Sequence, residues 1–190
     1  MIKLIYCDPS FTDQTVLVDY QTQFALNGKV ILVNSLSELE QKVLSGTVEC
    51  LLFLTLELTP IQLIFIERLM VAAPLPIIVN VRQWQTQVLS GLLNCGRITF
   101  VPDELSSHRL PMLINLAQAR FTAASSTLAS IQKLDNDIRI IKVVTQAKLV
   151  LMQQGITEST AHQLIQQQAM KKGLSVENMA NQIIDTQQAS

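Results

Sequence analysis

The chain is poor in aromatic residues, charged residues and histidine. Of its 190 residues, 5% are aromatic, 15% are charged and two are histidine, His108 and His162. Cys7, Cys50 and Cys95 lie apart, in or beside apolar segments, so no cluster has the composition of a metal site. An odd number of cysteines in such segments is typical of small buried residues in a reducing compartment rather than of disulfides.

Two further absences concern membranes and export. No run of about 18 uninterrupted apolar residues occurs, so we expect no transmembrane helix. The first residues, Met1–Tyr6, lack the long apolar stretch and the small-residue cleavage site of a signal peptide. We therefore expect a cytoplasmic protein.

The sequence also lacks catalytic motifs. It contains no glycine-rich phosphate loop, no Ser/His/Asp set and no conspicuous carboxylate pair, so we expect neither an enzyme nor a cofactor. The net charge and its distribution do not indicate a nucleic-acid partner either. Residues 1–120 carry 8 basic and 10 acidic groups, and residues 121–190 carry 6 and 5. A protein that binds by neutralising phosphates usually has a larger basic excess.

The first 120 residues do contain short apolar runs that alternate with amphipathic ones, a pattern typical of βα units around a parallel sheet. The predicted strands are 3–7, 30–33, 50–55, 76–81 and 98–101. The predicted helices are 13–27, 37–45, 61–72, 85–93 and 106–120. Ser37, with Glu40 at the third helical position, has the pattern of a capping box. We therefore expect a flavodoxin-like, CheY-like open α/β sheet.

That order of elements resembles the receiver domain of bacterial response regulators. A working receiver needs an acidic pair after strand one, an aspartate after strand three, a hydroxyl after strand four and a lysine after strand five. Here only Asp8 remains of the pair, Thr55–Glu57 contains no aspartate, and the last two positions fall near Val81 and within Phe100–Asp103.

Most parts for phosphoryl transfer are therefore missing. Glu57 could replace the acceptor, but its carboxylate would lie about one methylene out of place. Asp8 could be a turn residue before Pro9 or a retained metal ligand, and the turn is the favoured interpretation. We expect a pseudo-receiver without a phosphorylation site, kept for protein contacts.

A very long helix is expected next, because Met112–Gln154 contains neither glycine nor proline. Within it, four apolar residues are spaced as in a coiled-coil seam: Ile131, Leu134, Ile138 and Ile141. The alternative is a helix packed on its own domain. The polar flanks of this stripe favour dimerisation, since a lone apolar stripe would otherwise face water.

Three short helices are predicted at the C-terminal end. Gly155 is placed to end the long helix, and Thr157 to cap a second one with Glu158 in its first turn. Lys172-Gly173 ends the second helix, and Ser175 caps a third. The buried side of the third helix is expected from Val176, Met179, Ala180, Ile183 and Ile184.

This segment resembles the ANTAR domain of transcription antiterminators of the amide-regulator and nitrate-regulator type. The resemblance is carried by Ala147-Lys148, Leu151-Met152, Gly155, Glu158, Ala161, Leu164 and Ala169-Met170. It implies a dimeric antiterminator that binds leader mRNA hairpins and is held in check by a ligand-sensing partner of the amide- or nitrate-sensor kind. The expected organisation is a pseudo-receiver domain (1–122), a coiled-coil linker (123–142) and an ANTAR domain (143–190).

Specific RNA recognition targets unpaired bases through hydrogen bonds and stacking, so it needs polar side chains and a few cations. The candidates are Gln146, Lys148, Gln153, His162, Gln166, Lys171 and Lys172. Lys148 ranks first because it belongs to the Ala-Lys element of the resemblance, although residue type alone fits a solvated lysine. The residues expected in the core of this bundle are Ala147, Leu151, Met152, Ala161, Ala169 and Met170.

Two other classes of protein stay open at this point. One is a DNA-binding response regulator, although Ser175–Gln188 offers no arginine or lysine for a recognition helix. The other is a protein-interaction adaptor without a nucleic-acid target, which the near-neutral charge fits.

Overall fold

The computed structural model describes residues 2–11, 13–25, 28–46, 48–85, 90, 92 and 96–188. Its contacts divide the chain into two compact units, Met1–Thr127 and Leu128–Ser190. The division falls inside one helix, so each unit is described by itself.

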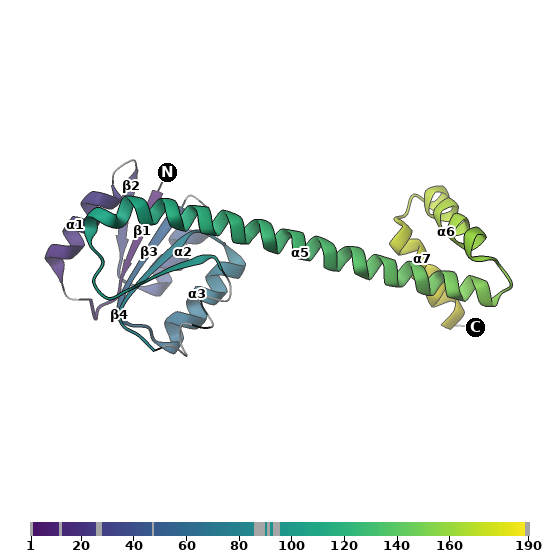
Figure 1. The fold of residues 1–190 in the computed structure, drawn as a ribbon, viewed down its shortest axis with the longest axis horizontal. Coiled ribbons are helices and arrows are strands. Elements are labelled where there is room, and N and C mark those ends of the chain that lie inside the picture. Colours follow the sequence, from purple (N-terminus) through teal and green to yellow (C-terminus); the bar gives the residue numbers. More distant parts are fainter. Residues whose placement is uncertain are drawn as a thin grey trace. The chain divides into compact units, whose positions relative to one another are not determined.

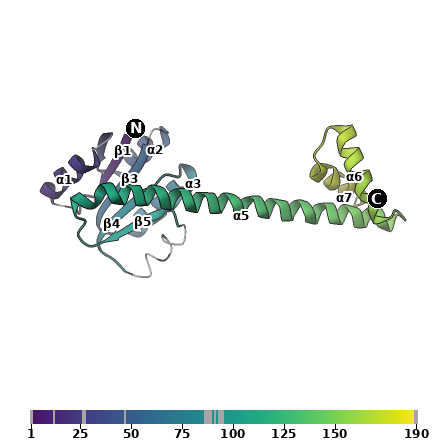
Figure 2. The same cartoon turned by 45° about the horizontal axis from the view of Figure 1, so that its top comes forward.

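The first unit contains a parallel sheet, which has five strands within the described residues (Figures 1 and 2). The strands are β1 (Ile2–Cys7), β2 (Lys29–Val33), β3 (Val48–Glu57), β4 (Ile77–Gln83) and β5 (Ile98–Pro102). Their order is β2-β1-β3-β4-β5, and every neighbouring pair is parallel. All five predicted strands are confirmed, and β3 is longer than expected. This is the flavodoxin-like arrangement that the sequence predicts.

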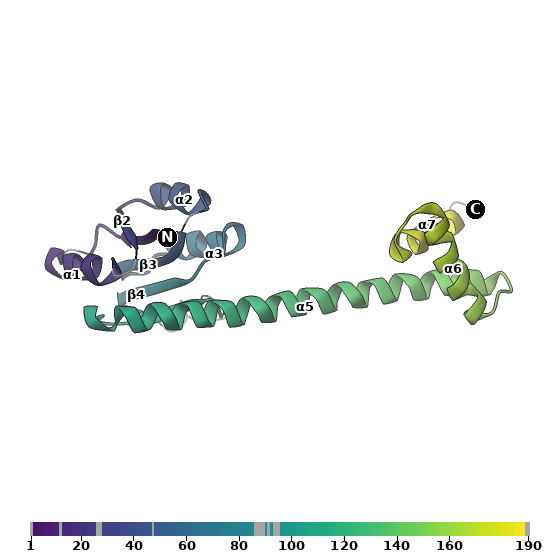
Figure 3. The same ribbon diagram turned by 90° about the horizontal axis from the view of Figure 1, so that it is seen from above.

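Helices cover both faces of this sheet. Helices α2 (Leu36–Leu44) and α3 (Pro60–Ala72) pack on one face, and α1 (Gln14–Phe24) packs on the other together with the first turns of α5 (Leu110–Gln153). Figure 3 shows α2 and α3 across the sheet from α5. Burial on both faces explains why the strands read as continuous apolar runs. The predicted helix 85–93 lies largely outside the described residues, as does Cys95, whereas Cys7 and Cys50 are buried as expected.

The predicted cap of α2 was wrong by two residues. Ser35, not Ser37, is the N-cap, and its hydroxyl accepts from the backbone N–H of Glu38 at 3.2 Å. Both serines precede a glutamate by three residues, so the capping pattern alone fits either one. The end of β2 at Val33 decides between them, because it leaves the chain in position to start the helix at Leu36.

The long helix predicted between Met112 and Gln154 is confirmed as α5, which a short 3₁₀ turn at Ser107–Arg109 precedes. In the second unit the end of α5 packs with α6 (Glu158–Lys172) and α7 (Val176–Gln188), as Figure 1 shows. Their shared core consists of Ala147, Leu151, Ala161, Ile165, Ala169, Met179 and Ala180.

The predicted ends of these helices are confirmed. Gly155 after α5 and Gly173 after α6 have φ of 87° and 66°, the left-handed conformation that glycine adopts without steric penalty. Thr157 and Ser175 cap the next helices, since their hydroxyls accept from the backbone N–H groups of Thr160 and Asn178. Local sequence thus defines the bundle's turns.

Candidate functional site

Asp8, at the carboxyl end of β1, is surrounded by internal hydrogen-bond donors. Its Oδ2 accepts from the Tyr6 hydroxyl at 3.1 Å and from Gln62 Nε2 at 2.7 Å, and its Oδ1 accepts from the backbone N–H of Ser10 at 2.9 Å. Burial raises the pKa of Asp8, but the hydrogen bonds from Ser10, Tyr6 and Gln62 outweigh it and hold the pKa below its usual value. The carboxylate therefore ties β1 to α3.

Residues at the carboxyl ends of β3 and β4 also form hydrogen bonds that stabilise the fold. Thr55 is buried, and its hydroxyl donates to the backbone carbonyl of Glu57 at 2.8 Å, while the Glu57 side chain is exposed. Asn80 donates to the carbonyls of Val101 and Asp103, both at 2.9 Å, which joins the ends of β4 and β5. Among the described residues, no group of three or more His, Cys, Asp or Glu could hold a metal ion.

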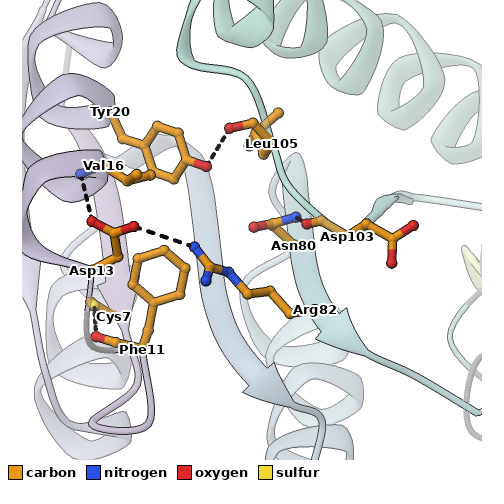
Figure 4. Close-up of polar contacts among 9 residues, drawn as sticks. All are labelled: Cys7, Phe11, Asp13, Val16, Tyr20, Asn80, Arg82, Asp103 and Leu105. Carbon is orange, nitrogen blue, oxygen red and sulfur yellow. Dashed lines mark hydrogen bonds and ion pairs between the residues drawn. The ribbon is translucent and has the colours of Figure 1, made fainter.

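A cation, Arg82, lies at the same edge (Figure 4). Its guanidinium stands 5.0 Å from the ring centroid of Phe11 and 3.8 Å from Asp13 Oδ2, and Asp13 also caps α1. The Tyr20 hydroxyl donates to the carbonyl of Leu105, and burial raises the pKa of Tyr20 to about 12. Arg82 thus connects β4 with the start of α1, in a role that the sequence patterns did not indicate.

In the second unit, Lys148 forms an ion pair that the sequence analysis missed. Its Nζ lies 2.7 Å from Glu158 Oε1, which links α5 to the first turn of α6. The Lys148 side chain is 21% exposed, so part of its stem is covered. Its hydrogen bond and charge lower the pKa of Glu158, and His162 adds a smaller effect in the same direction. The pair is ten residues apart in sequence, beyond the reach of helical spacing rules.

The other predicted RNA-binding residues are all exposed: Gln146, Gln153, His162, Gln166, Lys171 and Lys172. His162 lies one turn after Glu158 on α6. Lys171 and Lys172 lie in the last turn of α6, where Lys172 Nζ donates to Gln182 Oε1 of α7 at 3.3 Å. The predicted set thus lies on two helices: Gln146, Lys148 and Gln153 on α5, and His162, Gln166, Lys171 and Lys172 on α6.

Two of the six residues expected in the core lie at the surface. Met170 is 83% exposed and Met152 is 41% exposed, whereas Ala147, Leu151, Ala161 and Ala169 are buried as predicted. The small residues lie in the core that the three helices share, and neither methionine belongs to it. The family resemblance alone did not distinguish buried alanines and leucine from exposed methionines, because all of these residues are apolar.

The predicted seam residues of α5 are exposed in the described part of the single chain. Ile131, Leu134, Ile138 and Ile141 are 48%, 61%, 50% and 65% exposed. A different face of the same helix, which includes Val143, Val144 and Ala147, packs on the bundle core. Whether this stripe forms a dimer seam or packs on its own domain stays open, and the dimer remains a prediction.

Comparison with known families identifies the C-terminal part of the chain. Residues 132–184 match the family model of the ANTAR domain. This range begins within the segment 123–142 that we expect to form the coiled coil. A comparison with curated proteins gives no match.

Solved structures with a similar fold include a receiver domain and a response regulator. The signal receiver domain of a modulated diguanylate cyclase from Desulfovibrio desulfuricans G20 matches with a TM-score of 0.50 and 14% identity, over 64% of this chain and 96% of that one. The response regulator StyR aligns over 97% of this chain and 98% of its own, at 16% identity and a TM-score of 0.45.

Among the described residues, no helix is long and apolar enough to cross a membrane. The parallel sheet with helices on both faces and the family match in the C-terminal bundle agree with the order of parts expected from the sequence. The chain combines a parallel α/β sheet, similar in fold to a receiver domain, with a C-terminal segment, residues 132–184, that matches the family model of the ANTAR domain.

Proposed function

We propose that the protein is an RNA-binding regulator of transcription antitermination. The observation that carries this proposal is the ANTAR match at residues 132–184, within a unit whose helices share a buried apolar core and whose α6 and α7 have side-chain N-caps. Bound to hairpins of a nascent leader RNA in the cytoplasm, the protein would keep a terminator from forming. It would act by binding rather than by catalysis.

The active form in this proposal is a dimer joined along the coiled-coil segment 123–142, with the ANTAR unit following it. Support comes from the exposed stripe of Ile131, Leu134, Ile138 and Ile141, which leaves large apolar side chains in water in the single chain. Pairing two such stripes would give knobs-into-holes packing at heptad spacing.

The receiver-like unit would transmit a signal from a ligand-sensing partner of the amide- or nitrate-sensor kind rather than a phosphoryl group. Two observations support this. Asp8 is engaged by Tyr6, Ser10 and Gln62, and Thr55 donates its hydroxyl to the backbone. Incubation with acetyl phosphate and Mg²⁺ should leave the mass of the protein unchanged, and a phosphorylated species in the mass spectrum would contradict the pseudo-receiver.

Lys148 is the first candidate for RNA contact, followed by Gln146, Gln153, His162, Gln166, Lys171 and Lys172. Its pairing with Glu158 makes a simple alanine substitution ambiguous, because loss of binding could reflect either a lost RNA contact or a loosened α5–α6 junction. Glu158→Gln provides the matched control, since it breaks the same ion pair and leaves the cation in place.

The test is binding of the purified protein to a leader RNA with two adjacent hairpins, beside a loop-scrambled RNA and the matching duplex DNA. We expect loop-dependent binding that weakens with added salt. Lys148→Ala should weaken it and Glu158→Gln should not. Equal weakening by both variants would assign Lys148 a structural role. Equal or absent binding to all three nucleic acids would reject the antiterminator and favour a protein-interaction adaptor.

A further inference from the structure

A cavity of about 360 Å³ opens between the end of α5 and helices α6 and α7. Its lining combines amide and ammonium groups with apolar side chains: Gln154, Gln168, Lys172, Met179, Gln182 and Ile183. A volume of this size is within the range of small-ligand sites. Of these residues, only Lys172 was among the RNA-binding candidates from the sequence.

The apolar and polar parts of the lining have different degrees of exposure. Met179 is buried and Ile183 is half-buried, whereas Gln154, Lys172 and Gln182 are exposed and Gln168 is intermediate. The cavity therefore has an apolar floor and a polar rim. A flat heterocycle with hydrogen-bonding edges fits such a lining, because its face can contact the floor while its edge meets the amides.

Some polar groups of the rim are hydrogen-bonded to each other, and others make no hydrogen bond to a described residue. Lys172 Nζ donates to Gln182 Oε1 at 3.3 Å, which orients the Gln182 amide. The side-chain amides of Gln154 and Gln168 make no hydrogen bond to another described residue. Each amide offers donors and an acceptor, the pair of functions with which glutamine reads the edge of a base.

The composition of this unit favours recognition of an RNA base in a cavity over stacking of bases on aromatic side chains. The sequence contains no Phe, Tyr or Trp after Phe121. Single-stranded RNA is commonly held by bases stacked on aromatic rings, and this unit has no such ring apart from the His162 imidazole. Its 6 basic and 5 acidic groups after residue 120 also limit what phosphate contacts can contribute. Affinity and specificity must come from hydrogen bonds and burial.

We propose that this cavity receives one unpaired base from the loop of the bound RNA. Met179 and Ile183 contact the face of the base, and the amides of Gln154 and Gln168 bond to its edge. Lys172 holds Gln182 in place and adds a positive charge near the adjoining phosphate. This inference rests on the proposed function. It specifies that an unpaired base of the RNA is the group recognised and that the cavity is where it binds.

The test uses the full-length protein with Gln154→Met and Gln168→Met, which preserve side-chain length and helix propensity but remove the amide. Gln167→Met is the matched control, because Gln167 is the exposed neighbour of Gln168 and does not line the cavity. Each cavity variant should weaken binding of the two-hairpin RNA by about 3- to 10-fold, as loss of one or two hydrogen bonds predicts. The control should bind like the wild type. Circular dichroism of all three should show unchanged helix content.

A second measurement follows the base itself. Each loop base of the RNA is replaced in turn by 2-aminopurine, whose fluorescence rises when it leaves a stack. Because the cavity contains no aromatic ring, we expect one loop position to brighten on binding. If no position brightens, or if the cavity variants bind as tightly as Gln167→Met, the cavity proposal is overturned while loop-dependent binding by the wild type leaves the proposed function standing. Failure of the wild type to bind would overturn both.

Discussion

The Ile138→Lys substitution tests the proposed dimer most directly. Ile138 lies in the middle of the seam and is 50% exposed in the single chain. Complete burial of an isoleucine side chain stabilises by about 1.5–3 kcal/mol, so covering the exposed half contributes about 0.8–1.5 kcal/mol per chain. A dimer loses this contribution twice, about 1.5–3 kcal/mol in total.

Since about 1.4 kcal/mol corresponds to a factor of ten, the dimer dissociation constant should rise by roughly 10- to 140-fold. The value is a lower bound, because two ammonium groups would also face each other at the seam. Sedimentation equilibrium over a range of protein concentrations measures this constant. Gln132→Lys adds the same charge at an exposed position outside the stripe and should leave the constant nearly unchanged.

The outcome that refutes the reasoning is an Ile138→Lys variant that dimerises as strongly as Gln132→Lys. In that case the exposed stripe would not be the interface, and a dimer would have to form through another surface. A wild-type protein that stays monomeric at every concentration would reject the dimer altogether.

Three further perturbations test the fold that supports these sites. Ile165→Ala removes a fully buried side chain from the bundle core and should destabilise the second unit by about 2–5 kcal/mol, seen as an earlier loss of helical circular dichroism on heating. Gly155→Ala places a side chain at φ 87° with open space around it, so only backbone strain of about 1–2 kcal/mol is expected. Chemical denaturation should show a smaller loss of stability for Gly155→Asn than for Gly155→Ala. The pKa of Asp8 is lowered in the folded state, so the stability it adds is complete above its ordinary pKa of 3.8 and is lost as pH falls through the folded value. Asp8→Asn should therefore flatten the acid limb of a stability profile measured by urea denaturation, and an unchanged limb would show that other carboxylates dominate.

Several elements could be predicted because their causes are local. The five strands follow from apolar runs too short for helices, and α5 follows from the absence of glycine and proline between Met112 and Gln154. The bundle turns at Gly155 and Gly173 follow from the left-handed conformation that glycine adopts at helix ends. The capping box of Thr59 and Gln62 on α3 also had a readable pattern, Thr-x-x-Gln before an apolar run, which the sequence analysis did not use.

The candidate sites were less predictable, since their contacts join residues far apart in the chain. Gln62 bonds to Asp8 across 54 residues, and Arg82 stacks on Phe11 because β4 and the start of α1 meet at one edge of the sheet. The cavity residues Gln154, Gln168 and Gln182 are ordinary surface glutamines in the sequence. They line one cavity only because the end of α5, α6 and α7 bring them together.

By itself, the sequence determined the order and type of the elements, the length of α5, the helix ends and the family signature of the bundle, because each depends on neighbouring residues or on spacing along one helix. Only the tertiary structure decided that Lys148 pairs with Glu158, that Ser35 rather than Ser37 caps α2, and that Met152 and Met170 lie at the surface. These outcomes depend on how helices cross and where strands end, and many distant contacts set that geometry together.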